Sequence, residues 1–260
     1  MPYAQTNIQL YAQLLQADWM DADLRRVQAA YELAMRLFAG HFRPNQKTFL
    51  AHLVGTASIL ATHGAESETV VAGLLHSVYS HGEFGDSSRG ITSVKRQVVR
   101  GAVGDHCEAL IDRYTSIRWS LSEIVALATS AGSLSVQDTS VTLIKLADVL
   151  EDHLERGMQY SPHKKLPGGG GGDDAWCGAL IELAAALGHD RLAAELKTAF
   201  EPTDQRPVPE FLFGHKPGSF VLAPISHRVR TIVRLGRLFR RRRWVGGLGR
   251  RSCDGQASYL

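Results

Sequence analysis

Cysteines and long apolar runs are scarce in this 260-residue sequence, and each scarcity excludes a class of protein. The three cysteines, Cys107, Cys177 and Cys253, lie far apart and form no CxxC pair, which argues against a disulfide framework or a thiolate zinc site. No apolar run approaches the roughly 20 residues that cross a bilayer, and the amino terminus lacks the basic-then-apolar layout of a signal peptide. We therefore expect a cytoplasmic protein that folds around a hydrophobic core without cross-links.

Positive charge is concentrated at one end of the chain. The net charge is +3, but residues 1–200 carry 17 Lys+Arg against 22 Asp+Glu, whereas residues 201–260 carry 12 against 4. Ten arginines lie between Arg228 and Arg251, and apolar residues alternate with them in a way that allows a basic amphipathic helix. Such a tail contacts an anionic membrane surface, binds nucleic acid phosphates, or stays disordered until it meets an acidic partner. Specific recognition of nucleic acid is not expected, because no nucleic-acid-binding motif is present.

The body of the chain has the periodicity of helices. Between residues 5 and 199 the apolar positions recur at spacings of three and four, and strand-like alternation is almost absent, so we expect an all-α fold. Helix starts with a side-chain acceptor are predicted at Asp21, Thr48, Ser67 and Asp105. The predicted divisions are a helical extension (1–20), one helical domain (21–200), and a Pro-containing linker with the Arg-rich tail (201–260).

Three polar residues interrupt apolar helical stripes in a pattern that indicates a metal site. They are His52 in Thr48–Thr56, His76 in Ala72–Tyr79, and Asp148 in Ile144–Asp152. Imidazole and carboxylate groups are ligands that divalent first-row metals accept, and two His with one carboxylate leave positions open for water and substrate. A single buried His is more often a hydrogen-bonded core residue, so the hypothesis depends on all three together. We expect one divalent ion, Mn, Fe or Zn.

These three segments, in this order and spacing, resemble the HD superfamily of metal-dependent phosphohydrolases. The likeness is strongest to the hydrolase domain of the guanosine tetraphosphate (stringent-response) enzymes and covers about residues 25–157. It implies an HD-domain-like helical bundle, with metal ligands at His52, His76 and Asp148. It also implies that the segment containing Arg43 and Gln46 approaches a nucleotide.

The chain departs from this family at two places. Ser77 stands where the family has the Asp of its His-Asp pair, and a neutral hydroxyl does not compensate the charge of a dication as a carboxylate does. The acidic pair expected three and four residues later is replaced by Ser80 and His81. Ordinary guanosine tetraphosphate hydrolysis is therefore not expected, and the motif His76-Ser-Val-Tyr79 looks like that of a divergent HD-like group.

Other groups are candidates to replace the missing carboxylates. Glu83 lies in the loop after the motif, and Glu151 lies one helical turn beyond Asp148 as a general base or an element of a solvated acidic face. Tyr79 is a candidate proton donor or a core aromatic residue. The candidate catalytic residues are Glu83, Glu151 and Tyr79, and the candidate substrate-binding residues are Arg43, Gln46, Ser77, His81 and Arg96.

Three functions are consistent with these residues. The first is a metal-dependent hydrolase that acts on a phosphorylated or nucleotide-like small molecule. The second is a mononuclear non-haem iron oxygenase, because two His and one carboxylate are also the ligands of those enzymes. The third is a non-catalytic ligand-binding or regulatory module that keeps the HD-like fold. The oligomeric state stays open, a homo-oligomer included.

Overall fold

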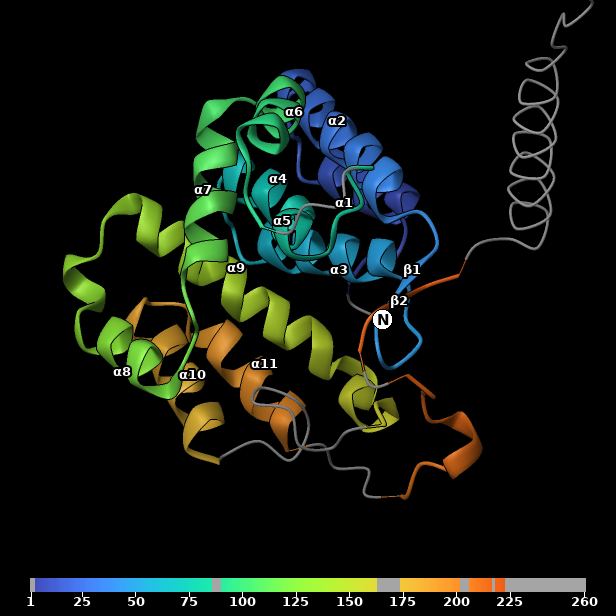
Figure 1. Cartoon of the computed structure of the whole chain (residues 1–260). Helices are drawn as coiled ribbons and strands as arrows, with labels where there is room; N and C mark the ends of the chain where they lie inside the picture. The colour runs from blue at the N-terminus through green and yellow to red at the C-terminus, as the bar shows by residue number, and fades with distance from the viewer. Residues whose placement is uncertain (1–2, 86–89, 163–173, 202–205, 217, 223–260) are drawn as a thin grey trace, which may run out of the picture. The chain divides into compact units, whose positions relative to one another are not determined.

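The computed structural model describes residues 3–85, 90–162, 174–201, 206–216 and 218–222, and residues up to Val221 form one compact unit (Figure 1). The predicted all-α class is confirmed, and the predicted basic tail lies outside the described residues. The α-helices are α1 (Asn7–Gln16), α2 (Asp21–Phe38), α3 (Phe49–Thr62), α4 (Ser67–Leu75), α5 (Val78–His81), α6 (Ser93–Val103), α7 (Asp105–Ser116), α8 (Leu121–Thr129), α9 (Val136–His153), α10 (Asp174–Ala186) and α11 (Asp190–Phe200). Short 3₁₀ turns are η1 (Ala131–Ser133), η2 (Leu154–Tyr160) and η3 (Glu210–Leu212), and two short strands are β1 (His41–Phe42) and β2 (Phe220–Val221).

Helices α3, α4 and α9 lie at the centre of this unit. Helix α3 packs against both α4 and α9, and α1, α2 and α7 cover them (Figure 1). The reason is composition: α3 and α4 are apolar on nearly every side, so burial on all faces is favourable. A polar side chain on the buried faces of these three helices, such as that of His52 or Asp148, is therefore held in the interior.

Of the four residues predicted to cap the start of a helix, one does so. Thr48 caps α3 by accepting a hydrogen bond from the amide of Ala51. Asp21, Ser67 and Asp105 are instead the first residues inside their helices, so their predicted capping role is wrong. The two acidic residues still lie in the first turn, where negative charge interacts favourably with the free amide groups.

The chain after α11 packs back onto the body. We call residues 206–216 with 218–221 the strap. Its strand β2 pairs antiparallel with β1, and the rings of Phe42 and Phe220 stack with centroids 5.5 Å apart. The amide of Gly214 donates to the carbonyl oxygen of Tyr160 over 2.8 Å. The strap therefore contacts both β1 and η2.

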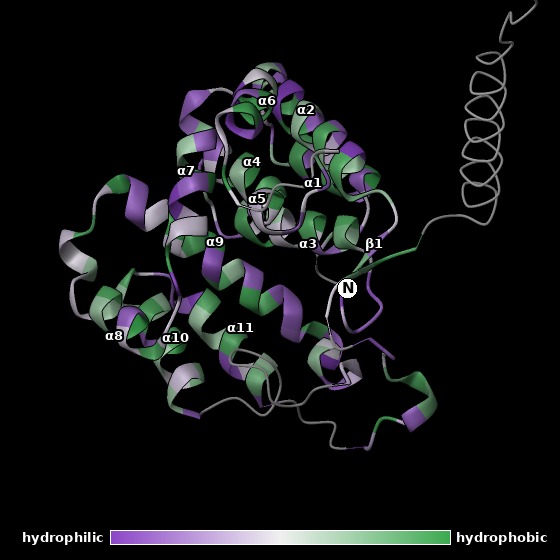
Figure 2. Cartoon of the chain, in the orientation of Figure 1, coloured by the Kyte–Doolittle hydropathy of each residue, from purple (hydrophilic) through white to green (hydrophobic). Residues whose placement is uncertain are grey.

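Polarity separates the central helices from those that cover them. Figure 2 shows apolar residues along α3 and α4, whereas α2 and α7 carry hydrophilic residues among the apolar ones. Within the part of the chain that the structure describes, none of the helices has the length and apolar content that a membrane span requires.

Candidate metal centre and adjoining pocket

The three predicted metal ligands meet in the interior. His52 lies on α3, His76 is the residue that ends α4, and Asp148 lies on α9. Their side chains come together because α3 packs against the other two helices. The distances are 3.2 Å from His52 Nε2 to Asp148 Oδ1, 3.4 Å from His76 Nε2 to the same oxygen, and 3.3 Å between the two Nε2 atoms. We call these three residues the triad.

Hydrogen bonds fix the orientation of both imidazole rings. His76 Nδ1 donates to the carbonyl oxygen of Gly73 over 2.8 Å, and His52 Nδ1 donates to Glu151 Oε2 over 2.6 Å. A carbonyl or carboxylate oxygen can only accept a hydrogen bond, so each Nδ1 carries a hydrogen. Each Nε2 is directed at the space between the three residues of the triad. Histidines that bind metals are oriented in the same way, through the ring nitrogen that does not touch the ion.

The triad fits a divalent cation. Ligand atoms about 2.0–2.2 Å from one ion lie roughly 3.0–3.5 Å from one another, and the three ligand-atom distances of the triad fall in that range. His52 and His76 are buried, and Asp148 is 7% exposed. Two nitrogen lone pairs that face each other beside a carboxylate repel unless a proton or a cation lies between them. The donor set, two imidazoles and one carboxylate, suits Mn, Fe or Zn.

Charge around His52 strengthens its binding of a proton or a cation. Burial and Arg43 lower the pKa of His52, but the carboxylates of Glu151, Asp152 and Asp148 outweigh them, and the pKa is raised overall. A proton and a divalent ion therefore compete for Nε2.

The second oxygen of Asp148 is held by two donors. Tyr114 on α7 donates its hydroxyl to Asp148 Oδ2 over 2.7 Å, and Lys145 places its ammonium 2.9 Å from the same oxygen. Burial acts to raise the pKa of Asp148, but Lys145 and the imidazoles of His52 and His76 outweigh it and hold the pKa well below its usual value. Asp148 is therefore an ionised carboxylate with one oxygen, Oδ1, directed at the two Nε2 atoms.

Glu151 is buried behind the triad, with both carboxylate oxygens engaged. Oε2 accepts from His52, while Oε1 pairs with the ammonium of Lys47 and accepts from Gln5 Nε2 at 3.4 Å. Burial acts to raise the pKa of Glu151, but His52 and Lys47 lower it by more, so the group stays ionised. The same carboxylate, with His52 and Asp152, forms a second set of neighbouring oxygen and nitrogen atoms suited to a cation.

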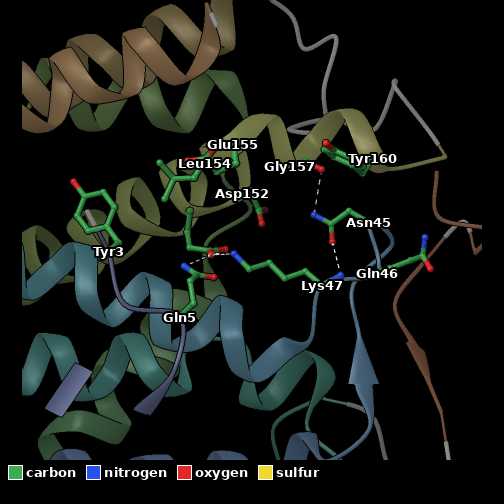
Figure 3. A pocket seen from close by; sticks show the side chains of 11 residues that line it. Tyr3, Gln5, Asn45, Gln46, Lys47, Asp152, Leu154, Glu155, Gly157 and Tyr160 are labelled. Carbon is green, nitrogen blue, oxygen red and sulfur yellow. Dashed lines mark hydrogen bonds and ion pairs between the residues drawn. The ribbon is translucent and has the colours of Figure 1, made fainter. Parts of the chain in front are cut away.

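A pocket of about 410 Å³ lies beside Glu151, and it is lined by Gln5 and Lys47, the two residues that contact Glu151 Oε1 (Figure 3). It lies between the loop that follows β1, the segment before α1, and η2. The residues that line it are Tyr3, Gln5, Asn45, Gln46, Lys47, Glu151, Asp152, Leu154, Glu155, Gly157 and Tyr160. Amide, aromatic and charged groups all contribute, which is typical of sites for small molecules with both apolar and polar parts.

Two of the predicted substrate-binding residues lie beside these features. Arg43 pairs with Asp152 over 2.5 Å and lies 5.7 Å from the ring centre of Phe49. Gln46 lines the pocket and donates to the carbonyl oxygen of Phe213 in the strap over 3.3 Å. The loop between β1 and α3 therefore places Arg43 on Asp152 and Gln46 in the pocket that Asp152 also lines.

Tyr79 and Arg96 meet at a different place, because both bond to Glu108. The hydroxyl of Tyr79 donates to Glu108 Oε1 over 2.7 Å, and Arg96 lies 3.0 Å from the same oxygen. Arg100 lies 2.9 Å from Glu108 Oε2. The structure therefore joins Tyr79 and Arg96 to a buried ionic cluster and does not bring them to the triad.

The remaining predicted residues lie around the end of α4. Ser77 follows His76 directly and is partly buried. The ring of His81 packs against Phe49 with centroids 5.1 Å apart, and Phe49 in turn contacts His52 at 6.4 Å. Glu83 is exposed in the loop after α5, where its amide donates to the carbonyl oxygen of Leu37.

The residues that sequence reasoning missed are Tyr114, Lys145, Lys47, Gln5 and Tyr3. Lys145 had a usable signal, because it lies three residues before Asp148 on the same helix face. Tyr114 and Gln5 had none, since their contacts join segments 34 and 146 residues apart in the sequence.

A protein-family model and curated sequences resemble this chain. Residues 34–118 match a family described as a domain of unknown function (DUF6817). The GTP pyrophosphokinases of Streptomyces coelicolor and Streptomyces antibioticus are each 30% identical over 169 residues, which is 64% of this chain but 18% of the relative. A probable GTP pyrophosphokinase of Mycobacterium leprae is 28% identical over 152 residues, or 55% of this chain and 17% of the relative. The chain thus matches less than a fifth of the length of these relatives.

A solved structure also resembles the fold. It is described as "A metazoan ortholog of SpoT hydrolyzes ppGpp and plays a role in starvation responses", and it is 18% identical with a TM-score of 0.44. The match covers 70% of this chain and 96% of that one. The sequence matches alone make this chain similar to a part of the GTP pyrophosphokinases.

Proposed function

We propose that this protein is a metal-dependent hydrolase of a phosphorylated, nucleotide-like small molecule. The observation that carries the proposal is the triad, in which two imidazoles of fixed orientation and one carboxylate oxygen converge within 3.4 Å of one another. His52, His76 and Asp148 would hold one divalent ion. Such an ion makes water more acidic and polarises a phosphoryl oxygen, which is the chemistry that phosphoester hydrolysis requires.

The adjoining pocket supports the nucleotide-like part of the proposal. Tyr3, Leu154 and Tyr160 offer surfaces for a planar ring, while the amides of Asn45 and Gln46 offer hydrogen bonds to its edge. Arg43 is the candidate group for binding a phosphate. Its guanidinium pairs with Asp152, which also lines the pocket. Because the curated relatives are GTP pyrophosphokinases, a guanine nucleotide is the first ligand to test.

The residues divide into supporting and reacting roles. Glu151 is proposed as a positioning residue, because both of its oxygens already accept hydrogen bonds or ion pairs. Glu83 stays a proposal as the base, since its loop follows α5, next to the end of α4 that carries His76. Ser77 and His81 are proposed as polar neighbours of the substrate.

The test is metal content combined with product release. Wild type and the His76→Ala and Asp148→Asn variants are incubated with Mn²⁺, Fe²⁺ or Zn²⁺, and bound metal is measured by elemental analysis after desalting. We expect about one ion per wild-type chain and none in either variant. His153→Ala is the matched control, because His153 also lies on α9 but its ring packs on Phe200 at 4.8 Å. Absence of metal from the wild type with all three ions rules out the proposal.

Release of phosphate or pyrophosphate from GTP and guanosine tetraphosphate then separates the alternatives. Release that requires the metal supports the hydrolase. A protein that binds metal and nucleotide but releases neither phosphate nor pyrophosphate is a ligand-binding module, an alternative that Ser77 favours because it stands where the family has a carboxylate. Oxygen uptake that depends on Fe²⁺ would indicate the oxygenase instead.

A further inference from the structure

We infer that the segment Tyr3–Gln5, which precedes α1, forms a wall of the ligand pocket, and that Gln5 is a specificity-determining residue for the ring of the ligand. The inference rests on the proposed function. The segment lies outside residues 34–118, which the family model matches, and no residue of it was singled out by sequence.

The segment is fixed on the body by three contacts. The amide of Ala4 donates to Ser58 Oγ over 2.8 Å, and the hydroxyl of Tyr3 bonds to Glu195 on α11 and lies 3.3 Å from His63 Nε2. Tyr3 is only 4% exposed and Ala4 only 6%. Residues anchored in this way are a permanent part of the pocket, so they contribute to recognition without an ordering cost.

Gln5 reaches the carboxylate that supports the triad. Its Nε2 lies 3.4 Å from Glu151 Oε1, the oxygen that Lys47 also contacts. Gly55 on α3 leaves the space in which Gln5 and Glu151 contact each other. A Cβ atom at Gly55 would lie 2.6 Å from Glu151 Cγ and 2.9 Å from Gln5 Nε2.

This contact sets which atom Gln5 offers to a ligand. Because Nε2 donates to Glu151, the orientation of the amide is fixed, and Oε1 is the acceptor it presents. Lys47 is a donor, and Glu151 is already engaged by His52 and Lys47. An N–H group on the edge of a heteroaromatic ring is therefore the ligand feature that Gln5 recognises.

Tyr3 and Tyr160 place the ring. Both side chains line the pocket, as does that of Leu154 (Figure 3). A planar ring gains contact with these apolar surfaces while its edge meets the amides. The ligand part recognised here is thus an uncharged heteroaromatic base.

The test compares two probes, GTP and inorganic pyrophosphate, on the metal-loaded full chain by titration calorimetry. Pyrophosphate has no ring, so it reports the phosphate and metal contacts alone. We expect Gln5→Ala to weaken GTP binding by about 5- to 10-fold and to leave pyrophosphate binding and metal content unchanged. Gln13→Ala is the matched control: Gln13 also anchors α1 to α3, through the Ser58 carbonyl at 3.0 Å, but does not line the pocket.

The outcomes separate this inference from the function it rests on. Wild-type protein that binds GTP no better than Gln5→Ala does overturns the inference and leaves the hydrolase proposal standing. Equal weakening of GTP and pyrophosphate by Gln5→Ala also overturns it, because the variant then acts through Glu151 and the metal. If the metal-loaded wild type binds neither probe, the proposed function and the inference both fail.

Discussion

Tyr114 donates to Asp148 Oδ2, the oxygen directed away from the two imidazole Nε2 atoms. Partners that hold a metal ligand from behind typically contribute 10- to 100-fold to metal affinity. We therefore expect Tyr114→Phe, which removes only the hydroxyl, to raise the dissociation constant for Mn²⁺ or Zn²⁺ by at least about 10-fold. Titration calorimetry with the desalted protein measures this directly.

Tyr79→Phe is the matched control for that variant. Its hydroxyl is also donated to a carboxylate, but that of Glu108, so metal affinity should be unchanged. Burial and Glu108 raise the pKa of Tyr79, so the phenol stays protonated and donating. Loss of this bond should lower the free energy of unfolding by about 1–3 kcal/mol. A metal affinity that falls equally in both variants would show that Tyr114 acts only through stability.

Candidate metal-binding residues could be predicted from the sequence only where neighbouring residues marked them. His52, His76 and Asp148 each interrupt an apolar stripe, and their candidate ligand atoms lie within 4.8 Å of one another in the fold. Tyr79 sits in the same motif, yet the turn between α4 and α5 directs it to Glu108. Which direction a side chain takes after a helix ends depends on the turn geometry, and residue spacing does not report that.

Helix α3 can lie close to Glu151 because Gly55, which has no side chain, is at the point of contact. A Cβ atom at Gly55 would lie 2.6 Å from Glu151 Oε1, so Gly55→Ala must displace the carboxylate that orients His52. We expect a loss of about 1–3 kcal/mol in the free energy of unfolding, together with weaker metal binding. Urea denaturation measures the first and calorimetry the second.

Gly101→Ala on α6 is the control for the helix itself. A Cβ atom there meets nothing within 4 Å, so Ala should stabilise the helix by about 0.5–1 kcal/mol through its better helix propensity. If Gly55→Ala were as benign as Gly101→Ala, the close approach of α3 to Glu151 would be wrong.

The helices were predictable as elements, whereas the strap was not. Apolar residues at spacings of three and four mark each long helix, because burial of one stripe is decided locally. The pairing of β1 with β2 joins residues 41–42 to 220–221, and each strand has only two residues. Such short strands have no periodicity of their own, so their pairing depends on the packed body that brings them together.

The whole chain consists of a body with its own hydrophobic core and an Arg-rich C-terminal segment. The described unit carries its core residues up to Leu196, and the strap returns the chain to β1 before the ten arginines begin at Arg228. Contact of the tail with an anionic membrane surface or with an acidic partner remains a proposal. A chain ending at Leu222 should therefore keep the melting temperature and metal content of the full chain.

The full chain should bind vesicles that contain anionic phospholipid, and the chain ending at Leu222 should not. Each Arg near an anionic surface contributes about 1 kcal/mol at low salt, and the attraction is screened over roughly 10 Å at 0.1 M salt. Cosedimentation at low salt and at about 0.5 M salt measures this, and binding should be lost at the higher concentration. Neutral vesicles are the control, since the ten arginines gain nothing from them. Equal binding of the two chains to anionic vesicles would place the contact on the body and not on the tail.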